Sequence, residues 1–339
     1  ADEQKRSQIL INIKRRIASR FSTFAYREKI LEIDALMLWR SGNWKASLSI
    51  VDDIFQQNPN TGIVKNILQL PHRQLPDYII PELMRNLVRT KEIARLNLSG
   101  YGIRDLTPLS GMKLVYLDCS DNQLTSLTGL DGMPLEFLGS SGNRITSLEP
   151  LRGVPLRTLY CQENLIQDLS PLDSRTLIEL NCSWNRLSSL ESLRGFALDR
   201  LFCRGNGIVS LDPLRGMPLQ RLDAGVNPIS SVEALRGMPL EFLRLDATKI
   251  ADLSPLRGMP LAVLGLYNCG NLRDLSPLLD LGTLEILSIS EHGTDLSRLK
   301  ALPGLILITS EQSLPFGGDS KLRETWREPD HAKPLPRKK

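Results

Sequence analysis

Leucine and other apolar residues recur along the middle of the chain with a period of 21 residues. The positions that open successive segments on this spacing are Ile93, Leu114, Leu135, Leu156, Leu177, Leu198, Leu219, Leu240 and Leu261. Leu284 follows after 23 residues and Leu305 after another 21, which gives about eleven repeats over residues 93–310. One segment of this length cannot bury its own leucines, so the period predicts coils that stack into a solenoid.

The repeat that begins at Leu177 shows how each coil is expected to fold. Leu180 and Cys182 alternate with polar neighbours, which predicts a short strand, and stacked strands pair in parallel. Asn185 follows, and its amide can bond backbone groups where the chain leaves the strand. Turns such as Gly-Met-Pro at 216–218 then reverse the chain. The leucines that return to the same core are Leu187, Leu190 and Leu193.

The phrase Asp-Leu-Ser-Pro-Leu occurs at residues 168–172 and again at 252–256. These phrases resemble the repeats of bacterial internalins, which are leucine-rich-repeat proteins with units of about 21 residues. The phrase Arg-Gly-Met-Pro-Leu at 215–219 is similar to planctomycete-type bacterial repeats, which often follow a serine/threonine kinase or another signalling domain. Over residues 93–310 the resemblance implies an α/β solenoid, a leucine-rich-repeat array with a parallel concave β-sheet. The resemblance is specific for the fold. It says little about function, because such solenoids bind unrelated partners.

The segment before the array predicts helices. Residues 1–92 are expected to form a helical region that caps the first coil, with Pro81 opening its last helix. Within this region, residues 28–61 resemble a single tetratricopeptide repeat, although Ser47 replaces the usual alanine. The positions that match the spacing of that motif are Ala35, Leu38, Gly42, Trp44, Leu48, Phe55 and Pro59.

The segment after the array and the distribution of charge bear on possible partners. Residues 311–339 predict a mostly flexible, basic, proline-rich extension, in which Trp326 either folds back onto the last coil or serves as a docking residue. The net charge is +4, but the array itself is slightly acidic and the excess lies on the flanks, at residues 14–20 and 337–339. Binding of nucleic acid or anionic membrane through these flanks is therefore a minor alternative, and nucleic acid is not the expected partner.

Four cysteines share one repeat position, which points into the predicted core: Cys119, Cys161, Cys182 and Cys203. Zinc ligands usually stand two to four residues apart, so buried free thiols are expected rather than a metal site. Cys269 is placed in a longer turn. Unpaired cysteines favour a reducing compartment and a cytoplasmic protein, whereas a signal peptide removed before Ala1 would favour a secreted or cell-surface one.

Several other kinds of chemistry are not expected. The three histidines, the acidic residues and the glycines show no catalytic, metal-binding or phosphate-binding spacing, so neither an enzyme nor a cofactor is predicted. No run of 18 apolar residues predicts a transmembrane segment. Five arginines recur near the turns, where stacking could form a basic ridge for nucleic acid or anionic lipid. Four of them follow an acidic residue by three positions, which instead predicts local pairing. The five arginines are Arg152, Arg194, Arg215, Arg236 and Arg257.

The residues that flank the buried leucine of each strand carry an unusual share of the few aromatic side chains. Aromatic residues and arginine are enriched at protein interfaces, so this face is predicted to bind a protein or peptide. The alternative is that the rings only pack on one another along the sheet. The predicted partner-binding residues are Tyr116, Phe137, Tyr160, Trp184, Arg200, Phe202, Arg204, Arg221, Phe242, Arg244 and Tyr267.

The favoured function is thus a protein-binding scaffold. A second hypothesis is a sensor or substrate-recruiting region of a larger bacterial signalling enzyme, such as a serine/threonine kinase. That hypothesis rests on the planctomycete-type resemblance, on the helical lead-in and on a first residue, Ala1, that is not methionine. No feature of the sequence specifies an oligomeric state.

Overall fold

The computed structural model describes residues 31, 34–36, 38–39, 43–57, 94–172, 176–290, 296–300 and 304–308. The chain divides into two compact units, residues 1–177 and residues 178–339, which are taken in turn. The predicted cap helix at Pro81 and the C-terminal extension from residue 311 with Trp326 lie outside the described residues.

The first unit contains the helix α3 (Trp44–Gln57). Its Leu48 and Val51 are buried, as are Ala35 and Trp39 before it. The Oγ atom of the buried Ser47 donates a hydrogen bond of 2.7 Å to the carbonyl oxygen of Ala35. A serine can therefore replace alanine in α3 without leaving its hydroxyl unsatisfied. Parts of the predicted tetratricopeptide-like hairpin, including residues 28–30 and 58–61, lie outside the described residues, and that resemblance stays a prediction.

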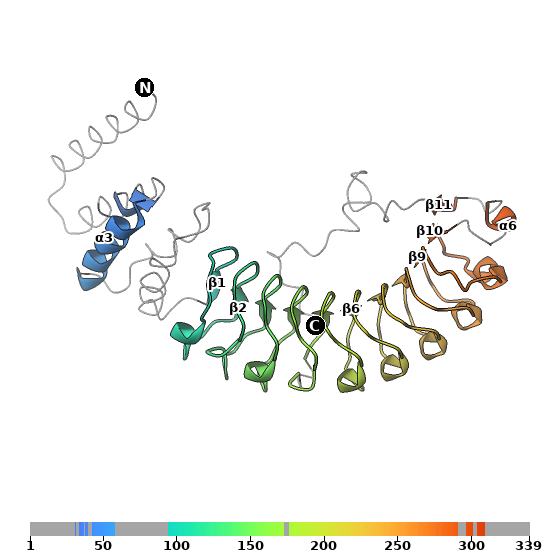
Figure 1. Cartoon of the computed structure of the whole chain (residues 1–339), viewed down its shortest axis with the longest axis horizontal. Helices are drawn as coiled ribbons and strands as arrows, with labels where there is room; N and C mark the ends of the chain where they lie inside the picture. Colours follow the sequence, from blue (N-terminus) through green and yellow to red (C-terminus); the bar gives the residue numbers. More distant parts are fainter. Residues whose placement is uncertain are drawn as a thin grey trace, which may run out of the picture. The chain divides into compact units, whose positions relative to one another are not determined.

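Four short parallel strands follow in the first unit (Figure 1). They are β1 (Arg95–Asn97), β2 (Tyr116–Asp118), β3 (Phe137–Gly139) and β4 (Thr158–Tyr160). Each pairs with the next at a shift of 21 residues, so that Leu96, Leu117, Leu138 and Leu159 are register partners. The sequence period thus becomes the register of these four strands, because the coils that join them have the same length.

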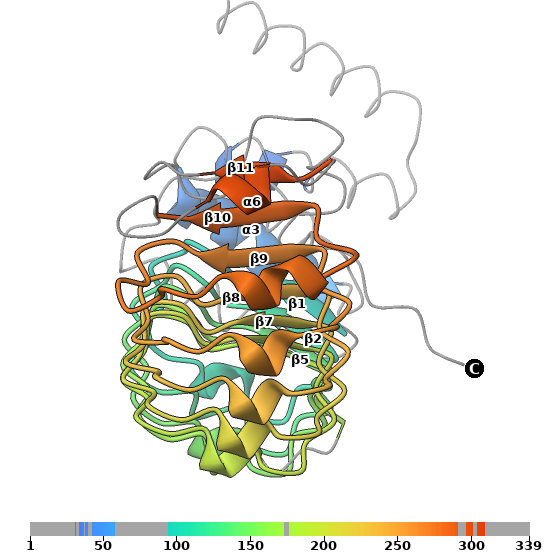
Figure 2. The same ribbon diagram turned by 90° about the vertical axis from the view of Figure 1, so that its right-hand side faces the viewer.

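The second unit continues the pattern with strands that Figure 2 shows stacked on one another from β7 to β10. The strands described in this unit are β5 (Glu179–Asn181), β6 (Arg200–Phe202), β7 (Arg221–Asp223), β8 (Phe242–Arg244), β9 (Val263–Leu266), β10 (Ile286–Ile289) and β11 (Ile306–Ile308). All of their pairings are parallel. A one-turn helix, α6 (Ser297–Lys300), precedes β11.

On the side of each coil opposite to the strand, most coils form a short 3-10 helix (Figure 1). The first unit holds η1 (Thr107–Leu109) and η2 (Glu149–Leu151); the second holds η3 (Glu191–Leu193), η4 (Asp212–Leu214), η5 (Glu233–Leu235), η6 (Ser254–Leu256) and η7 (Ser276–Asp280). In several of them proline stands in the first turn, where no N–H is needed. The coil then reverses at glycines such as Gly216, whose φ of 74° suits a residue without a side chain.

In several coils an asparagine that follows the strand satisfies the backbone of two coils. Asn143 accepts a hydrogen bond from the N–H of Leu124 and donates to the carbonyl oxygens of Cys119, Ser140 and Ser141. Asn227 makes the same set of contacts in the second unit. The amide predicted to bond the backbone at Asn185 does so, to the carbonyls of Cys182 and Ser183. The predicted leucine-rich-repeat solenoid is therefore confirmed.

Candidate partner-binding surface

The strand face is the surface formed by the side chains that flank the buried leucine of each strand. All of the predicted partner-binding residues except Trp184 lie on this face or on the position just after it. The structure separates them into two groups, an aromatic group in the first unit and a charged group in the second.

The aromatic group is a ladder of rings. Tyr116 stacks on Phe137 with the ring centroids 4.3 Å apart, and Phe137 meets Tyr160 edge-on at 5.5 Å. The guanidinium of Arg95 lies 4.2 Å above the Tyr116 ring, a cation–π geometry. Burial raises the pKa of Tyr116, with Asp118 adding to the rise and Arg95 opposing it. Tyr116 and Phe137 are half-buried and Tyr160 is buried, so the first two rings of the ladder keep part of their surface accessible.

The charged group contains a closed network of two arginines and two aspartates. The Nη1 atom of Arg204 lies 3.2 Å from Asp246 Oδ2, and Arg244 contacts the same oxygen through Nη2 at 2.9 Å. Both arginines also approach Asp223, at 3.6 and 3.7 Å. Arg204 reaches across the intervening coil at Gly225, where a Cβ would collide with its guanidinium. The network is nearly buried, so it fixes side-chain geometry more than it adds stability.

Arg200 and Arg221, which are register partners on β6 and β7, differ in their contacts. Arg200 Nη1 lies 3.1 Å from Glu179 Oε2, and its Nε lies 3.5 Å from Asp199. Arg221 is the register partner of Arg200 on β7 and is half-buried. Within the part of the chain that the structure describes, the side chain of Arg221 makes no hydrogen bond or ion pair; only its backbone N–H donates, to the carbonyl oxygen of Asp199. Burial lowers the pKa of Arg221, and the nearby positive charge of Arg200 lowers it further.

The remaining predicted residues of the second unit are exposed to different degrees. Phe202 and Tyr267 are half-buried and accessible from the strand face. Phe242 is only 8% exposed, so it belongs mainly to the core. The backbone N–H of Tyr267 donates to Asp246 Oδ1 at 3.0 Å, which links the last predicted ring to the charged network.

Trp184 lies at the edge of the strand face, on the residue before the asparagine. This position has a left-handed backbone in the coils from Gly100 to Asn268, and Trp184 has a φ of 53° while its side chain is 48% exposed. Its indole lies over Gly205 of the next coil, where a Cβ would overlap the ring. Val226 has a φ of 54° at the same position, although β-branched residues rarely adopt this conformation.

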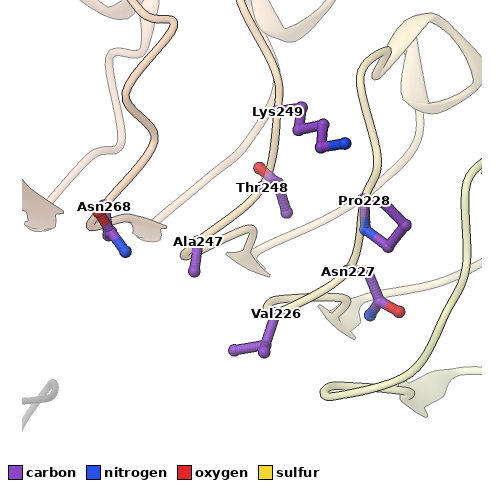
Figure 3. Close-up of a pocket in the computed structure, with 7 residues that line it drawn as sticks. All are labelled: Val226, Asn227, Pro228, Ala247, Thr248, Lys249 and Asn268. Carbon is purple, nitrogen blue, oxygen red and sulfur yellow. The ribbon is translucent and has the colours of Figure 1, made fainter.

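The same edge carries a shallow pocket in the second unit. Figure 3 shows Val226, Ala247 and Asn268 on three successive coils at its rim. Asn227, Pro228, Thr248 and Lys249 complete the lining. Its polar groups are mostly exposed or hydrogen-bonded to the backbone. The side-chain amide of Asn227 donates to the carbonyl of Ala224, and the Oγ1 of Thr248 donates to the carbonyl of Leu245. The pocket therefore presents a small apolar hollow without a converging set of polar groups.

The arginines near the turns pair locally, as predicted. Ion pairs of 2.5–3.0 Å join four of them to the acidic residue three positions earlier: Arg152–Glu149, Arg194–Glu191, Arg215–Asp212 and Arg236–Glu233. Hydrogen bonds from these arginines lower the pKa of Glu149, Glu191 and Glu233. Arg257 pairs instead with Asp280. The turn side is thus an ion-paired surface and does not form a basic ridge.

The five cysteines are free and buried, which confirms the core interpretation for Cys119, Cys161, Cys182 and Cys203. Cys269 stands at the asparagine position of its coil, where the longer turn begins. Its Sγ donates to the carbonyl of Leu245 at 3.1 Å, so a thiol replaces the usual amide there. Burial raises the pKa of Cys182 to about 12, which keeps it protonated and unreactive at neutral pH.

Two absences among the described residues bear on other classes of function. These residues contain no cluster of three or more His, Cys, Asp or Glu side chains that could hold a metal ion. None of the described helices combines the length and the apolar character that a membrane crossing requires.

Sequence reasoning missed the acidic partners of the arginines. Glu179, Asp223 and Asp246 were visible as residues of the strand face, but their pairing with arginines 21 or 42 residues away was not predicted. The signal was present, because register neighbours in this array differ by one period. Placing the strand-face residues of successive repeats in columns brings Glu179 beside Arg200 and Asp223 beside Arg244.

The parallel strands, the asparagine contacts and the leucine core define this chain as a leucine-rich-repeat solenoid. No family model matches the sequence, and comparison with curated proteins finds no match. Among solved structures, an internalin (inlF) from Listeria monocytogenes is similar, with a TM-score of 0.64 and 25% identity over 68% of this chain and 71% of that one. The plant peptide hormone receptor RGFR1, solved in complex with RGF2, has a TM-score of 0.50 and 18% identity, covering 73% of this chain and 54% of the receptor. The receptor shares the fold alone.

Proposed function

We propose that this chain is a protein-binding scaffold that recognises a protein or peptide on its strand face. The observation that carries the proposal is the composition of that face, where half-buried rings and arginines stand side by side on a regular sheet. Tyr116, Phe137, Phe202 and Tyr267 offer rigid aromatic area, and Arg221 offers a cation. Rigid aromatic and arginine side chains dominate the binding energy of protein interfaces.

The structural relatives support this reading at the level of fold. Internalin (inlF) has the same type of repeat array, and the RGFR1 structure contains a bound partner, RGF2. The turn side of the coils is a less favourable binding surface, because the arginines near the turns are paired with acidic neighbours. On the strand face of the second unit, by contrast, the side chain of Arg221 has no ion-pair partner among the described residues.

The test compares two triple variants of equal size. Phe202→Ala/Arg221→Ala/Tyr267→Ala removes half-buried strand-face groups, whereas Arg194→Ala/Arg215→Ala/Arg236→Ala removes exposed arginines near the turns. Phe242 is left intact, because truncating a side chain that is 8% exposed would destabilise the fold. Each protein is used for affinity capture from a lysate of the source organism, with quantitative mass spectrometry and a circular dichroism check of folding.

We expect a set of captured proteins that the turn variant retains and the strand-face variant loses. Because the lost proteins must depend on residues of one face, a difference between the variants identifies the surface as well as the partners. Equal capture by both variants and the wild type would show that the strand face is not the binding surface.

A further inference from the structure

The second unit places two arginines side by side in register. Arg200 on β6 and Arg221 on β7 are direct partners in the parallel pairing. Like charges on adjacent strands destabilise a sheet unless other groups compensate them. Arg200 is compensated by Glu179 and Asp199, at 3.1 and 3.5 Å. Arg221 has no such partner among the described residues, so one half-buried guanidinium keeps all five of its N–H donors available.

The residues around Arg221 on its own and the following strands are either paired with other residues or apolar. Asp223, two residues further along β7, contacts Arg204 and Arg244. The residue in register with Arg221 on β8 is Phe242, and the residue in register with Phe242 on β9 is Val263. Neither of these register positions carries a carboxylate that could pair with Arg221. Phe242 and Val263 are buried. A charge-assisted hydrogen bond formed beside such an apolar wall is stronger than one formed in water.

We infer that Arg221, with Arg200 beside it, is a carboxylate-binding site, and that the partner is an acidic peptide segment that places one Asp or Glu side chain against Arg221. The inference rests on the proposed function and names the chemistry of its partner. A carboxylate fits the planar guanidinium with two parallel hydrogen bonds. It would also neutralise the repulsion between Arg200 and Arg221.

The charge pattern favours a peptide with a single carboxylate over a polyanion. Glu179, Asp199 and Glu241 all lie close enough to attract Arg221, although none of them reaches it. The same three carboxylates would repel the neighbouring phosphates of a nucleic acid backbone. One negative group can approach Arg221 between them, whereas a chain of evenly spaced phosphates cannot.

The experiment uses the full chain and an array of short random peptides. Bound peptides are resynthesised with a fluorescent label in two forms, one with the original Asp and Glu residues and one with Asn and Gln in their place. Affinities are measured by fluorescence anisotropy for the wild type, Arg221→Gln, Arg221→Lys, Phe202→Ala and the control Arg215→Gln. Arg215→Gln makes the same change of charge near a turn, outside the proposed site.

We expect peptides with an Asp or Glu side chain to be enriched among those bound, and their amide forms to bind about tenfold more weakly to the wild type, as for the loss of a charge-assisted pair. Arg221→Gln should show the same loss and no longer distinguish the two forms. Arg221→Lys should keep part of the preference, and Arg215→Gln should match the wild type. Arg221→Gln should also melt no lower than the wild type, because it removes an unpaired cation.

Four results would overturn the inference: equal binding of acid and amide forms, wild-type affinity in Arg221→Gln, a lowered melting temperature in that variant, or no peptide bound at all. The design separates this inference from the proposed function. If Phe202→Ala loses peptide binding and Arg221→Gln does not, only the carboxylate site is wrong. If peptides bind and neither variant affects them, the strand face itself is wrong.

Discussion

The indole of Trp184 lies directly over Gly205 of the following coil, and both residues have a left-handed backbone. Gly205, with a φ of 67°, has no Cβ to push the ring away. The exposed tryptophan is therefore positioned by a glycine 21 residues further along the chain. Two independent effects oppose a side chain at residue 205, the left-handed backbone and the overlap with the indole.

We expect Gly205→Ala to destabilise the protein by about 2–3 kcal/mol, of which about 1 kcal/mol comes from the backbone conformation and the rest from displacing the ring. The measurement is urea unfolding of Gly205→Ala, Trp184→Ala and the double variant. In the Trp184→Ala background only the backbone cost should remain. Additive effects in the double variant would mean that Trp184 does not occupy the space above Gly205.

Val226 occupies a position at which its own side chain is unfavourable. Its φ of 54° is rare for a β-branched residue, and Asn268 has a φ of 58° at the same position two coils later. We expect Val226→Asn to stabilise the protein by about 1 kcal/mol, because asparagine tolerates the left-handed region. The control is Val209→Asn at a valine that is 61% exposed and has no positive φ.

The control should change the free energy of unfolding by no more than about 0.5 kcal/mol, as is usual for a surface substitution. Both variants are compared by thermal and urea unfolding. A loss of stability in Val226→Asn would show that contacts of the valine at the rim of the pocket outweigh the backbone strain.

The buried asparagine provides a third test. Asn143→Ala removes the one hydrogen bond that the side-chain amide accepts and the three that it donates. Backbone groups of two coils are then left unsatisfied. We expect a cost of about 3–5 kcal/mol in urea unfolding, because buried polar groups lose their partners. Asn143→Thr should cost less, because Thr248 fills the same position and retains a hydrogen bond to the Leu245 carbonyl.

A matched control for this test is Asn97→Ala. Asn97 makes a single hydrogen bond of this kind, accepting from the N–H of Ser99 in an exposed setting, so its removal should cost about 1 kcal/mol or less. Equal costs for Asn143→Ala and Asn97→Ala would contradict the structural role given to the buried amide.

The sequence predicted the fold well because one constant period determines both the core and the strand register. Leu117, Leu138 and Leu159 fall in register without any information beyond their spacing. The strand-face charges were harder to interpret. Arg204 reaches Asp246 across two coils, and that contact depends on a glycine at 225, which a list of arginines and aromatics does not reveal.

Local conformation limited the prediction in a second way. The left-handed position before the asparagine is occupied by glycine in some coils and by Trp184 or Val226 in others, so residue type did not reveal it. Phe242 was predicted as an interface ring from its place beside a buried leucine. Phe242 is only 8% exposed between its register partners Arg221 and Val263, and a one-dimensional pattern does not show this burial.

The buried thiols predict how stability depends on alkaline pH. Burial raises the pKa of Cys182 from 9.0 to about 12, and the pKa values of Cys119 and Cys203 rise as well. Above pH 9 the thiols ionise in the unfolded chain but stay protonated in the folded one. The contribution of the thiols to the free energy of unfolding is therefore fully present below pH 9 and is lost between about pH 9 and 12. Each thiol lowers the free energy of unfolding by up to about 1.4 kcal/mol per pH unit in this window.

Cys182→Ala isolates one thiol from this effect. Ala224 occupies the same position in another coil and is fully buried, so alanine fits the core, and we expect a cost of about 1 kcal/mol at pH 7. Between pH 9 and 11 the variant should lose stability less steeply than the wild type, because one group no longer binds a proton differently in the two states. Urea unfolding at several pH values measures the slope, and alkylation of the native protein at pH 8 followed by mass spectrometry checks that Cys182 stays unmodified. Parallel slopes for wild type and variant, or alkylation of Cys182 before unfolding, would mean that this thiol is not sealed in the core.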